Sequence, residues 1–76
     1  MAKLPRKATL QELRLAVGVT QVELARRSGV PQAEVSKAER RSGHRVTTLR
    51  RYVEQLGGSL EIWARFGSKR VLLRSV

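Results

Sequence analysis

The chain has 76 residues, a length that suits one small domain with a limited hydrophobic core. Hydrophobic residues make up 41% of it, which is typical of a folded chain rather than a disordered one. Sixteen Lys and Arg stand against six acidic residues, all of them Glu, and the net charge is +10. This balance indicates a polyanionic partner, nucleic acid first and an anionic membrane second, and charge that only keeps the chain in solution is the alternative.

Missing residue types argue against several kinds of site. The chain has no Cys and no Asp, and its only His is His44, so we expect no disulfide framework, no metal site and no cofactor. A lone His without an Asp or Cys to orient it gives no nucleophile–base pair, so we expect no enzyme. No apolar run approaches the roughly 20 residues of a membrane span, and no apolar stretch follows the basic N-terminus, so we predict a cytoplasmic protein.

The first element in chain order is a basic N-terminal arm at residues 1–8, in which Pro5 opposes helix formation. A first helix should begin at Thr9, because Glu12 follows three residues later and the two side chains can cap the backbone N–H groups of each other. Gly18 should end this helix.

A second and a third helix follow, separated by a tight turn. The second should begin at Thr20, with Glu23 again three residues later, and end at Gly29, which can adopt a left-handed conformation and turn the chain sharply. Pro31 should occupy the first position of the third helix, where its fixed φ is tolerated. A polar, basic loop over residues 40–45 should follow.

The remainder of the chain changes character. A fourth helix should start near Thr47 and end at Gly57-Gly58. Alternating apolar residues then predict two strands, over residues 59–66 and 69–76, joined by a tight turn at Gly67-Ser68. We therefore predict a mainly α protein, with four helices over residues 9–57 and a C-terminal β-hairpin over residues 58–76.

The segment from Thr20 to Arg40 is the most informative part of the sequence, and it resembles the phage-repressor-like helix-turn-helix family, also called the Xre family. The resemblance extends from about Thr9 to Gly57. It rests on Gly18-Val19-Thr20-Gln21, Glu23-Leu24-Ala25, Gly29-Val30, Val35-Ser36 and Glu39-Arg40. It implies a repressor-like helix-turn-helix domain that binds double-stranded DNA.

The resemblance places four residues on the base-reading face of the third helix: Gln32, Ala33, Ser36 and Lys37. Gln pairs well with adenine, Lys favours guanine, and Ala offers apolar contact to a thymine methyl group. Glu34 would repel phosphate unless it accepts a hydrogen bond from cytosine N4. The alternative for Gln32 and Lys37 is that both are simply solvated helix residues.

Other residues are expected to contact the DNA backbone. Gln21 matches a family glutamine that contacts phosphate at a helix N-terminus, where the helix dipole favours anions. Arg40, Arg41 and Arg45 lie in the loop that meets the DNA backbone in the family. Arg26-Arg27 is better interpreted as a solvated helix face.

Two further positions concern the scaffold of the domain. Glu39 matches a family acid that pairs with an arginine of the first helix, and Arg14 occupies that arginine position, so the resemblance implies a scaffold ion pair. Pro31 stands where many family members have Ser, Thr or Asp, and a side-chain contact from that cap to phosphate is therefore lost.

The C-terminal hairpin carries apolar residues on both faces. Ala64 shares one face with Ile62 and Phe66. Val76 shares the other face with Trp63 and Leu72. One face can cover the chain's own helices, and the second needs a partner chain to leave water. The residues we assign to a dimer or partner interface are Leu60, Ile62, Trp63, Phe66 and Leu72.

Residues 46–66 are similar to the end of HigA-like and HipB-like antitoxins of toxin–antitoxin systems. The resemblance implies a homodimer that represses its own operon and also binds a toxin, and a single recognition helix that reads only a few base pairs favours a dimer independently. Many antitoxins of basic RNase toxins are acidic, whereas this chain is basic, which leaves the class of toxin open. The alternatives to a sequence-specific repressor are a general, nucleoid-type nucleic-acid binder and a protein-only inhibitor or adaptor.

Overall fold

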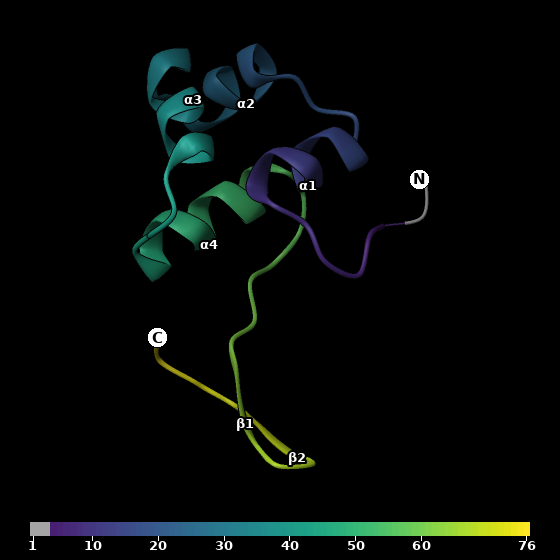
Figure 1. Cartoon of the computed structure of the whole chain (residues 1–76). Coiled ribbons are helices and arrows are strands. Elements are labelled where there is room, and N and C mark those ends of the chain that lie inside the picture. The colour runs from purple at the N-terminus through teal and green to yellow at the C-terminus, as the bar shows by residue number, and fades with distance from the viewer. Residues whose placement is uncertain (1–3) are drawn as a thin grey trace.

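The computed structural model describes residues 4–76 and contains four helices followed by a two-stranded antiparallel sheet (Figure 1). The predicted fold class is therefore confirmed. Of the basic arm expected at residues 1–8, residues 1–3 lie outside the described part of the chain. The elements are α1 (Leu10–Ala16), α2 (Gln21–Ser28), α3 (Gln32–Arg40), α4 (Val46–Gln55), β1 (Trp63–Phe66) and β2 (Lys69–Leu72).

The first two helices begin where their capping residues predict. Thr9 Oγ1 accepts a hydrogen bond from the Glu12 N–H at 3.1 Å, and the Glu12 carboxylate accepts one from the Thr9 N–H at 2.9 Å. Thr20 Oγ1 caps α2 in the same way, by accepting from the Glu23 N–H at 3.0 Å. The Glu23 carboxylate pairs instead with arginines one turn further along α2, so only half of the reciprocal pattern forms there.

Three predicted boundaries are corrected by the structure. Pro31 precedes α3 as its N-cap, because its ψ of 147° is extended and its carbonyl accepts the first hydrogen bonds of the helix. Strand β1 starts at Trp63, four residues after the predicted start at residue 59. Strand β2 ends at Leu72, so Val76 lies beyond the strand rather than beside Trp63 on one of its faces.

A small core holds the four helices together. Its buried members are Val19, Leu24, Val35 and Tyr52, and Leu24 of α2 is only 1% exposed. Helix α2 packs against both α3 and α4, so Leu24 lies where three helices meet. Burying a leucine side chain stabilises the fold by about 1.5–3 kcal/mol. Five partly buried residues complete the core: Leu10, Val17, Ala25, Val30 and Leu56.

The hairpin stands away from the helices, on the far side of the molecule from α2 and α3 (Figure 1). We expected one of its faces to cover the chain's own helices, and this expectation is wrong. Phe66 is 71% exposed, Trp63 is 44% exposed and every residue of β2 is exposed. The segment before β1 makes the contact instead, because Leu60 lines a groove with residues of α1 and α4.

The strand register gives the hairpin two chemically different faces. Trp63 pairs with Leu72 and Arg65 pairs with Arg70, and directly paired residues share a face. We call this the arginine face. The other face, which we call the apolar face, carries the two pairs Ala64–Val71 and Phe66–Lys69.

A substitution at Gly29 tests the turn between α2 and α3. Gly29 ends α2 with a φ of 73°, and a Cβ added there would meet no atom within 4 Å. Gly29→Ala should therefore destabilise the fold through backbone strain alone, by about 1–2 kcal/mol. Gly43→Ala is the matched control, because Gly43 also has open space and lacks a positive φ. We expect the control to change the free energy of unfolding by less than about 1 kcal/mol, in the stabilising direction. Equal losses in urea unfolding would contradict this reason for Gly29.

Candidate nucleic-acid interface

Helix α3 presents one face to the core and one to solvent. Val35 is 4% exposed and anchors the inner face. Gln32, Ala33 and Lys37 are exposed on the outer face, and Ser36 is half-buried beside them. The four residues predicted to read bases are therefore accessible on one short helix, which lies at an outer edge of the molecule (Figure 1).

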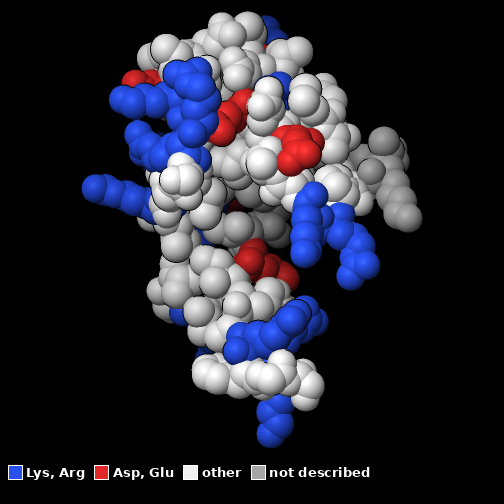
Figure 2. Space-filling view, viewed as in Figure 1, with Lys and Arg blue, Asp and Glu red and all other residues white. Residues whose placement is uncertain are grey.

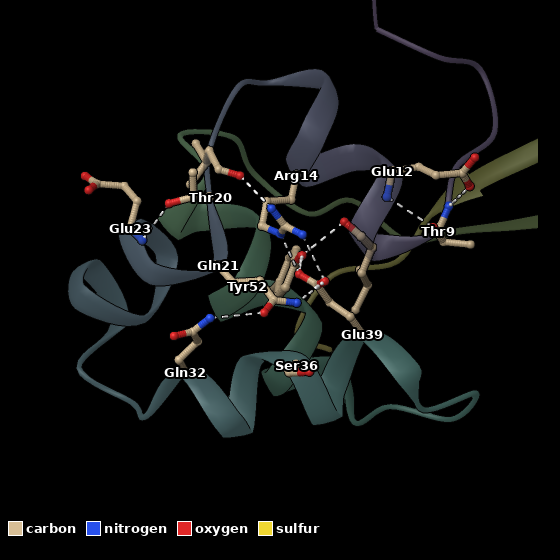
Figure 3. A network of polar contacts seen from close by, with 12 residues as sticks. Thr9, Glu12, Arg14, Thr20, Gln21, Glu23, Gln32, Ser36, Glu39 and Tyr52 are labelled. Atoms are coloured by element: carbon tan, nitrogen blue, oxygen red, sulfur yellow. Dashed lines mark hydrogen bonds and ion pairs between the residues drawn. The ribbon is translucent and has the colours of Figure 1, made fainter.

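A buried ion pair fixes the inner side of α3. Arg14 Nε of α1 donates to Glu39 Oε2 of α3 at 2.6 Å, and Arg14 Nη2 donates to Glu39 Oε1 at 3.2 Å (Figure 3). The side chains of Arg14 and Glu39 are only 5% and 3% exposed. Arg14 Nη1 also donates to the Val19 carbonyl at 2.8 Å. These are the two residues expected to form the scaffold pair, and the fork of Arg14 joins α1, the α1–α2 connection and α3.

Tyr52 of α4 is a member of this network that the sequence did not identify. Its hydroxyl lies 2.6 Å from Glu39 Oε2 and 3.0 Å from the Leu10 carbonyl. The hydroxyl has one hydrogen, and the shorter contact to a charged acceptor is the better bond, so we assign the donation to Glu39. Burial, reinforced by the bond to Glu39, raises the pKa of Tyr52 and keeps the phenol protonated as a donor. The available signal was a Tyr, instead of a Phe or Leu, at an inward position of α4.

Gln21 extends the network toward the base-reading face. Its Nε2 donates to Glu39 Oε1 at 3.0 Å, and its Oε1 accepts from Gln32 Nε2 at 3.4 Å (Figure 3). A side-chain amide nitrogen has two hydrogens, so Gln21 keeps one for another acceptor. A phosphate contact by Gln21 is therefore compatible with its place in the network. The chain of contacts Arg14–Glu39–Gln21–Gln32 connects α1 to the first residue of α3.

The charge state of Glu39 follows from its partners. Burial raises the pKa of the Glu39 carboxyl, whereas hydrogen bonds from Arg14, Tyr52 and Gln21 lower it. The donors together outweigh the burial, and the pKa lies below its ordinary value of 4.5. Glu39 is therefore ionised at neutral pH, as the partner of a buried guanidinium must be.

The basic residues near α3 are not neutralised by the chain's own acids. Figure 2 shows Lys and Arg side chains gathered along the side of the molecule that α3 occupies. The exposed residues Lys37, Arg40, Arg41 and Arg45 form no ion pair within residues 4–76. Arg40 donates to Ser36 Oγ, which leaves the Ser36 hydroxyl hydrogen free to donate.

Arg26 and Arg27 differ from these residues. Both pair with Glu23 on the same helix, and Arg27 also donates to the Gln55 carbonyl of α4 at 3.1 Å. Part of their charge is thus used within the fold, as expected for a helix face that does not contact DNA.

A groove of about 270 Å³ lies where α3 meets α2 and α4, along one flank of α3. Lys37 and Arg41 of the α3 region and Arg51 of α4 line it, together with Glu34. Arg51 was not predicted from the sequence, because a single arginine on a helix has no local pattern that marks it. The structure places Arg51 beside the predicted contacts, and it places Glu34 on the flank of α3 that faces this groove.

Within residues 4–76, no group of three or more His, Cys, Asp and Glu residues is arranged to hold a metal ion. Among the same residues, no helix has the length and apolarity needed to cross a membrane.

Comparisons with known proteins identify relatives of the chain. A model of the helix-turn-helix family matches residues 10–63. A putative antitoxin HigA2 of Mycobacterium tuberculosis (strain ATCC 25618 / H37Rv) is 41% identical over 66 residues, which cover 84% of this chain and 65% of the relative. The chain thus spans less than two thirds of the length of this curated relative.

Two solved structures are similar over nearly the whole chain. One, described as "Induced DNA bending by unique dimerization of HigA antitoxin", is 38% identical with a TM-score of 0.86, and the match covers 96% of this chain and 100% of that one. The other, described as "DNA bound antitoxin HigA3", is 39% identical with a TM-score of 0.85, and the match covers 95% and 96%.

The Glu39 network predicts how the stability of the fold depends on pH. A carboxyl whose pKa is lower in the folded chain stabilises the fold above its unfolded pKa, and this stabilisation is lost as the pH falls through the folded pKa. Glu39→Gln leaves Arg14 buried without a counter-charge, so at pH 7 it should lower the free energy of unfolding by about 3 kcal/mol. The difference from the wild-type chain should shrink as the pH falls below 4.5.

Urea unfolding at several pH values measures this difference. The matched control is Glu54→Gln, since Glu54 is exposed on α4 and forms no ion pair within residues 4–76. The control should behave like the wild-type chain at every pH. A Glu39→Gln deficit that is the same at pH 7 and pH 3 would contradict the account.

Proposed function

The chain belongs to the helix-turn-helix family, and from this premise we propose that it is a sequence-specific DNA-binding repressor and the antitoxin of a toxin–antitoxin pair that autoregulates its operon. The similarity to a putative antitoxin and to two solved HigA antitoxins supports the antitoxin role. That one of these structures is DNA-bound and the other concerns DNA bending supports the DNA-binding role.

The outer face of α3 is the single observation that carries the proposal. Gln32 and Lys37 offer hydrogen-bond donors to base edges, and Ala33 between them leaves room for close approach of the helix. Lys37 forms no ion pair within residues 4–76, and Gln32 is oriented by its contact with Gln21. This supports base reading over a merely solvated face, because a positioned donor loses less side-chain entropy when it binds.

Phosphate contacts would come from residues that flank this face. Arg40, Arg41 and Arg45 follow the outer face of α3 into the α3–α4 loop, and Arg51 adds a charge from α4. Gln21 has one amide hydrogen left, at the N-terminus of α2, where the helix dipole favours an anion. Such contacts fix the position of the protein on DNA and make its affinity depend on salt.

A homodimer would combine two such half-sites. We propose that residues 9–57 bind DNA and that residues 58–76 provide the contact between protomers, through the apolar face of the hairpin. Phe66 and Val71 on that face are 71% and 52% exposed, and only Lys69 carries a charge there. In a two-fold dimer each patch meets its own copy, so a face with few like charges is the better candidate.

A general, nucleoid-type nucleic-acid binder is the alternative that the net charge of +10 favours. In that case phosphate contacts supply nearly all of the affinity, and one sequence is bound as well as another. The ratio of affinities for operator and random DNA at one salt concentration separates the two functions.

Base reading predicts that substitutions on the outer face of α3 weaken operator binding and that a substitution on α2 does not. Lys37→Ala, and likewise Gln32→Ala, should weaken operator binding by about 1–3 kcal/mol and leave binding to random DNA nearly unchanged. Arg26→Ala is the matched control, since Arg26 is exposed but paired with Glu23, and it should change neither affinity by much. Fluorescence anisotropy with both DNAs at fixed salt measures the effects. Equal losses on operator and random DNA would reject base reading by α3.

Dimerisation through the apolar face predicts that Phe66→Asp yields a monomer, because the two-fold contact would bring two carboxylates into a water-excluding patch. Operator affinity should fall by about 100-fold or more, since the avidity of two linked half-sites is lost. Ser68→Asp in the exposed turn adds the same charge outside the face and should remain dimeric. Sedimentation velocity measures both variants, and a Phe66→Asp dimer would place the contact between protomers elsewhere.

A further inference from the structure

The arginine face of the hairpin contains an unfavourable pair of charges. Arg65 and Arg70 are direct cross-strand partners, and both are exposed. The Leu73 N–H donates to the Ile62 carbonyl at 2.9 Å, so these two residues form a hydrogen-bonded pair of the antiparallel ladder. Hydrogen-bonded and non-hydrogen-bonded pairs alternate along the ladder, and the register makes Arg65 and Arg70 a non-hydrogen-bonded pair, in which side chains lie closest. Like charges directly opposite each other destabilise a hairpin.

The rest of the chain does not relieve this repulsion. Neither Arg65 nor Arg70 forms an ion pair with any acid among residues 4–76. Glu61, two residues before β1, is the nearest acid in the sequence, and its carboxylate accepts a hydrogen bond from Trp63 Nε1 at 3.3 Å. The Arg70 guanidinium lies over the Trp63 ring, 4.8 Å from its centre, and this contact holds Arg70 in place without neutralising it.

We propose that the arginine face binds an acidic protein surface, a partner other than a second copy of this chain. Carboxylates placed between Arg65 and Arg70 would relieve their repulsion and can accept bidentate hydrogen bonds from each guanidinium. Trp63 and Leu72, 44% and 41% exposed on the same face, supply the apolar area beside the charges. Tryptophan and arginine are the residues that most often dominate the affinity of protein interfaces.

A second copy fits this face poorly. A two-fold contact would set the arginines of one protomer against those of the other, and like charges across an interface oppose association. The apolar face lacks this obstacle. The two faces of one hairpin are therefore suited to two different partners, which lets the protein hold its own copy and a second protein at once.

Nucleic acid also fits this face less well than an acidic protein does. Single-stranded nucleic acid binds by stacking its bases on exposed aromatic rings, and here Arg70 already covers one side of the Trp63 ring. The hairpin also lies on the far side of the molecule from α3, so DNA read by α3 does not extend directly to it (Figure 1). This inference rests on the proposed function, because it describes the surface by which an antitoxin would hold its protein partner.

Trp63 provides a direct probe, since it is the only Trp of the chain. A Glu-rich peptide with interspersed Leu residues is titrated into the full chain at fixed salt, and the fluorescence of Trp63 is followed. The wild-type chain should show a saturable change. Arg65→Glu should weaken peptide binding by at least about tenfold. The same variant should raise the thermal stability of the hairpin, because it converts the repulsive pair into an attractive one.

Arg26→Glu is the matched control, since it makes the same change of charge at an exposed position of α2, on the far side of the molecule from the hairpin (Figure 1). It should weaken peptide binding by less than about threefold. Equal losses in the two variants, or no response of Trp63 to the peptide in the wild-type chain, would overturn the proposal. So would a monomeric Arg65→Glu variant, because the arginine face would then be the contact between protomers.

Two further measurements separate this proposal from its premise. A single-stranded oligonucleotide of equal charge should change the fluorescence of Trp63 much less than the peptide does, and an Arg65-dependent response equal to that of the peptide would make the face a nucleic-acid surface instead. Operator binding by Arg65→Glu should equal that of the wild-type chain. If the wild-type chain discriminates no operator while the Arg65-dependent peptide binding persists, the proposed repressor function fails and the acidic-protein surface stands.

Discussion

The set of hydrogen bonds to the buried carboxylate of Glu39 is the interaction on which the rest of this structure depends. The carboxylate accepts hydrogen bonds from Arg14 of α1, Gln21 of α2 and Tyr52 of α4, while the backbone of Glu39 belongs to α3. All four helices therefore meet at one charged group whose side chain is 3% exposed. A buried charge is tolerated only when it is paired and fully hydrogen-bonded, so each helix has to hold its donor in place. The apolar core is small, and such a requirement specifies one arrangement of the helices in a way that a few apolar contacts do not.

The same network separates the two sides of α3 by function. Its inner side is committed to Glu39, and through Gln21 the network reaches Gln32 at the start of the helix. Its outer side carries side chains that form no ion pair within residues 4–76, along with arginines in the following loop. One acid, Glu39, is thus buried with Arg14, while these cations of α3 and the following loop stay exposed. In the proposed function, a recognition helix held in place by such a network loses less entropy when it binds DNA.

The sequence predicted the helical part of this protein well, and the reasons are local. Thr9 and Thr20 carry their own capping signals, and Gly29 lacks the Cβ that disfavours the left-handed turn. The Arg14–Glu39 pair was expected from family resemblance, since its 25-residue separation has no local signature. The role of Tyr52 was not predicted, because helical periodicity places a residue inward without saying which polar group it meets.

The position of the hairpin was also beyond the reach of sequence patterns. Alternation assigned Trp63 and Phe66 to opposite faces, and the register agrees with this assignment. Alternation cannot say whether either face packs on the helices, because the path of the residues between α4 and β1 decides that. This connecting segment carries the strands past the helices, so the exposed faces remain for other molecules (Figure 1).

A double-mutant cycle on Arg14 and Glu39 tests the central claim, that one buried ion pair organises the helices. Arg14→Met and Glu39→Leu each strand a buried charge, and each should lower the free energy of unfolding by about 3–5 kcal/mol. The double variant removes both charges, so it should be folded and more stable than either single variant. The free energy of unfolding of the double variant can be measured even if the single variants do not fold. A double variant that loses as much stability as the two single losses combined would show that the two side chains act independently, and would contradict the account.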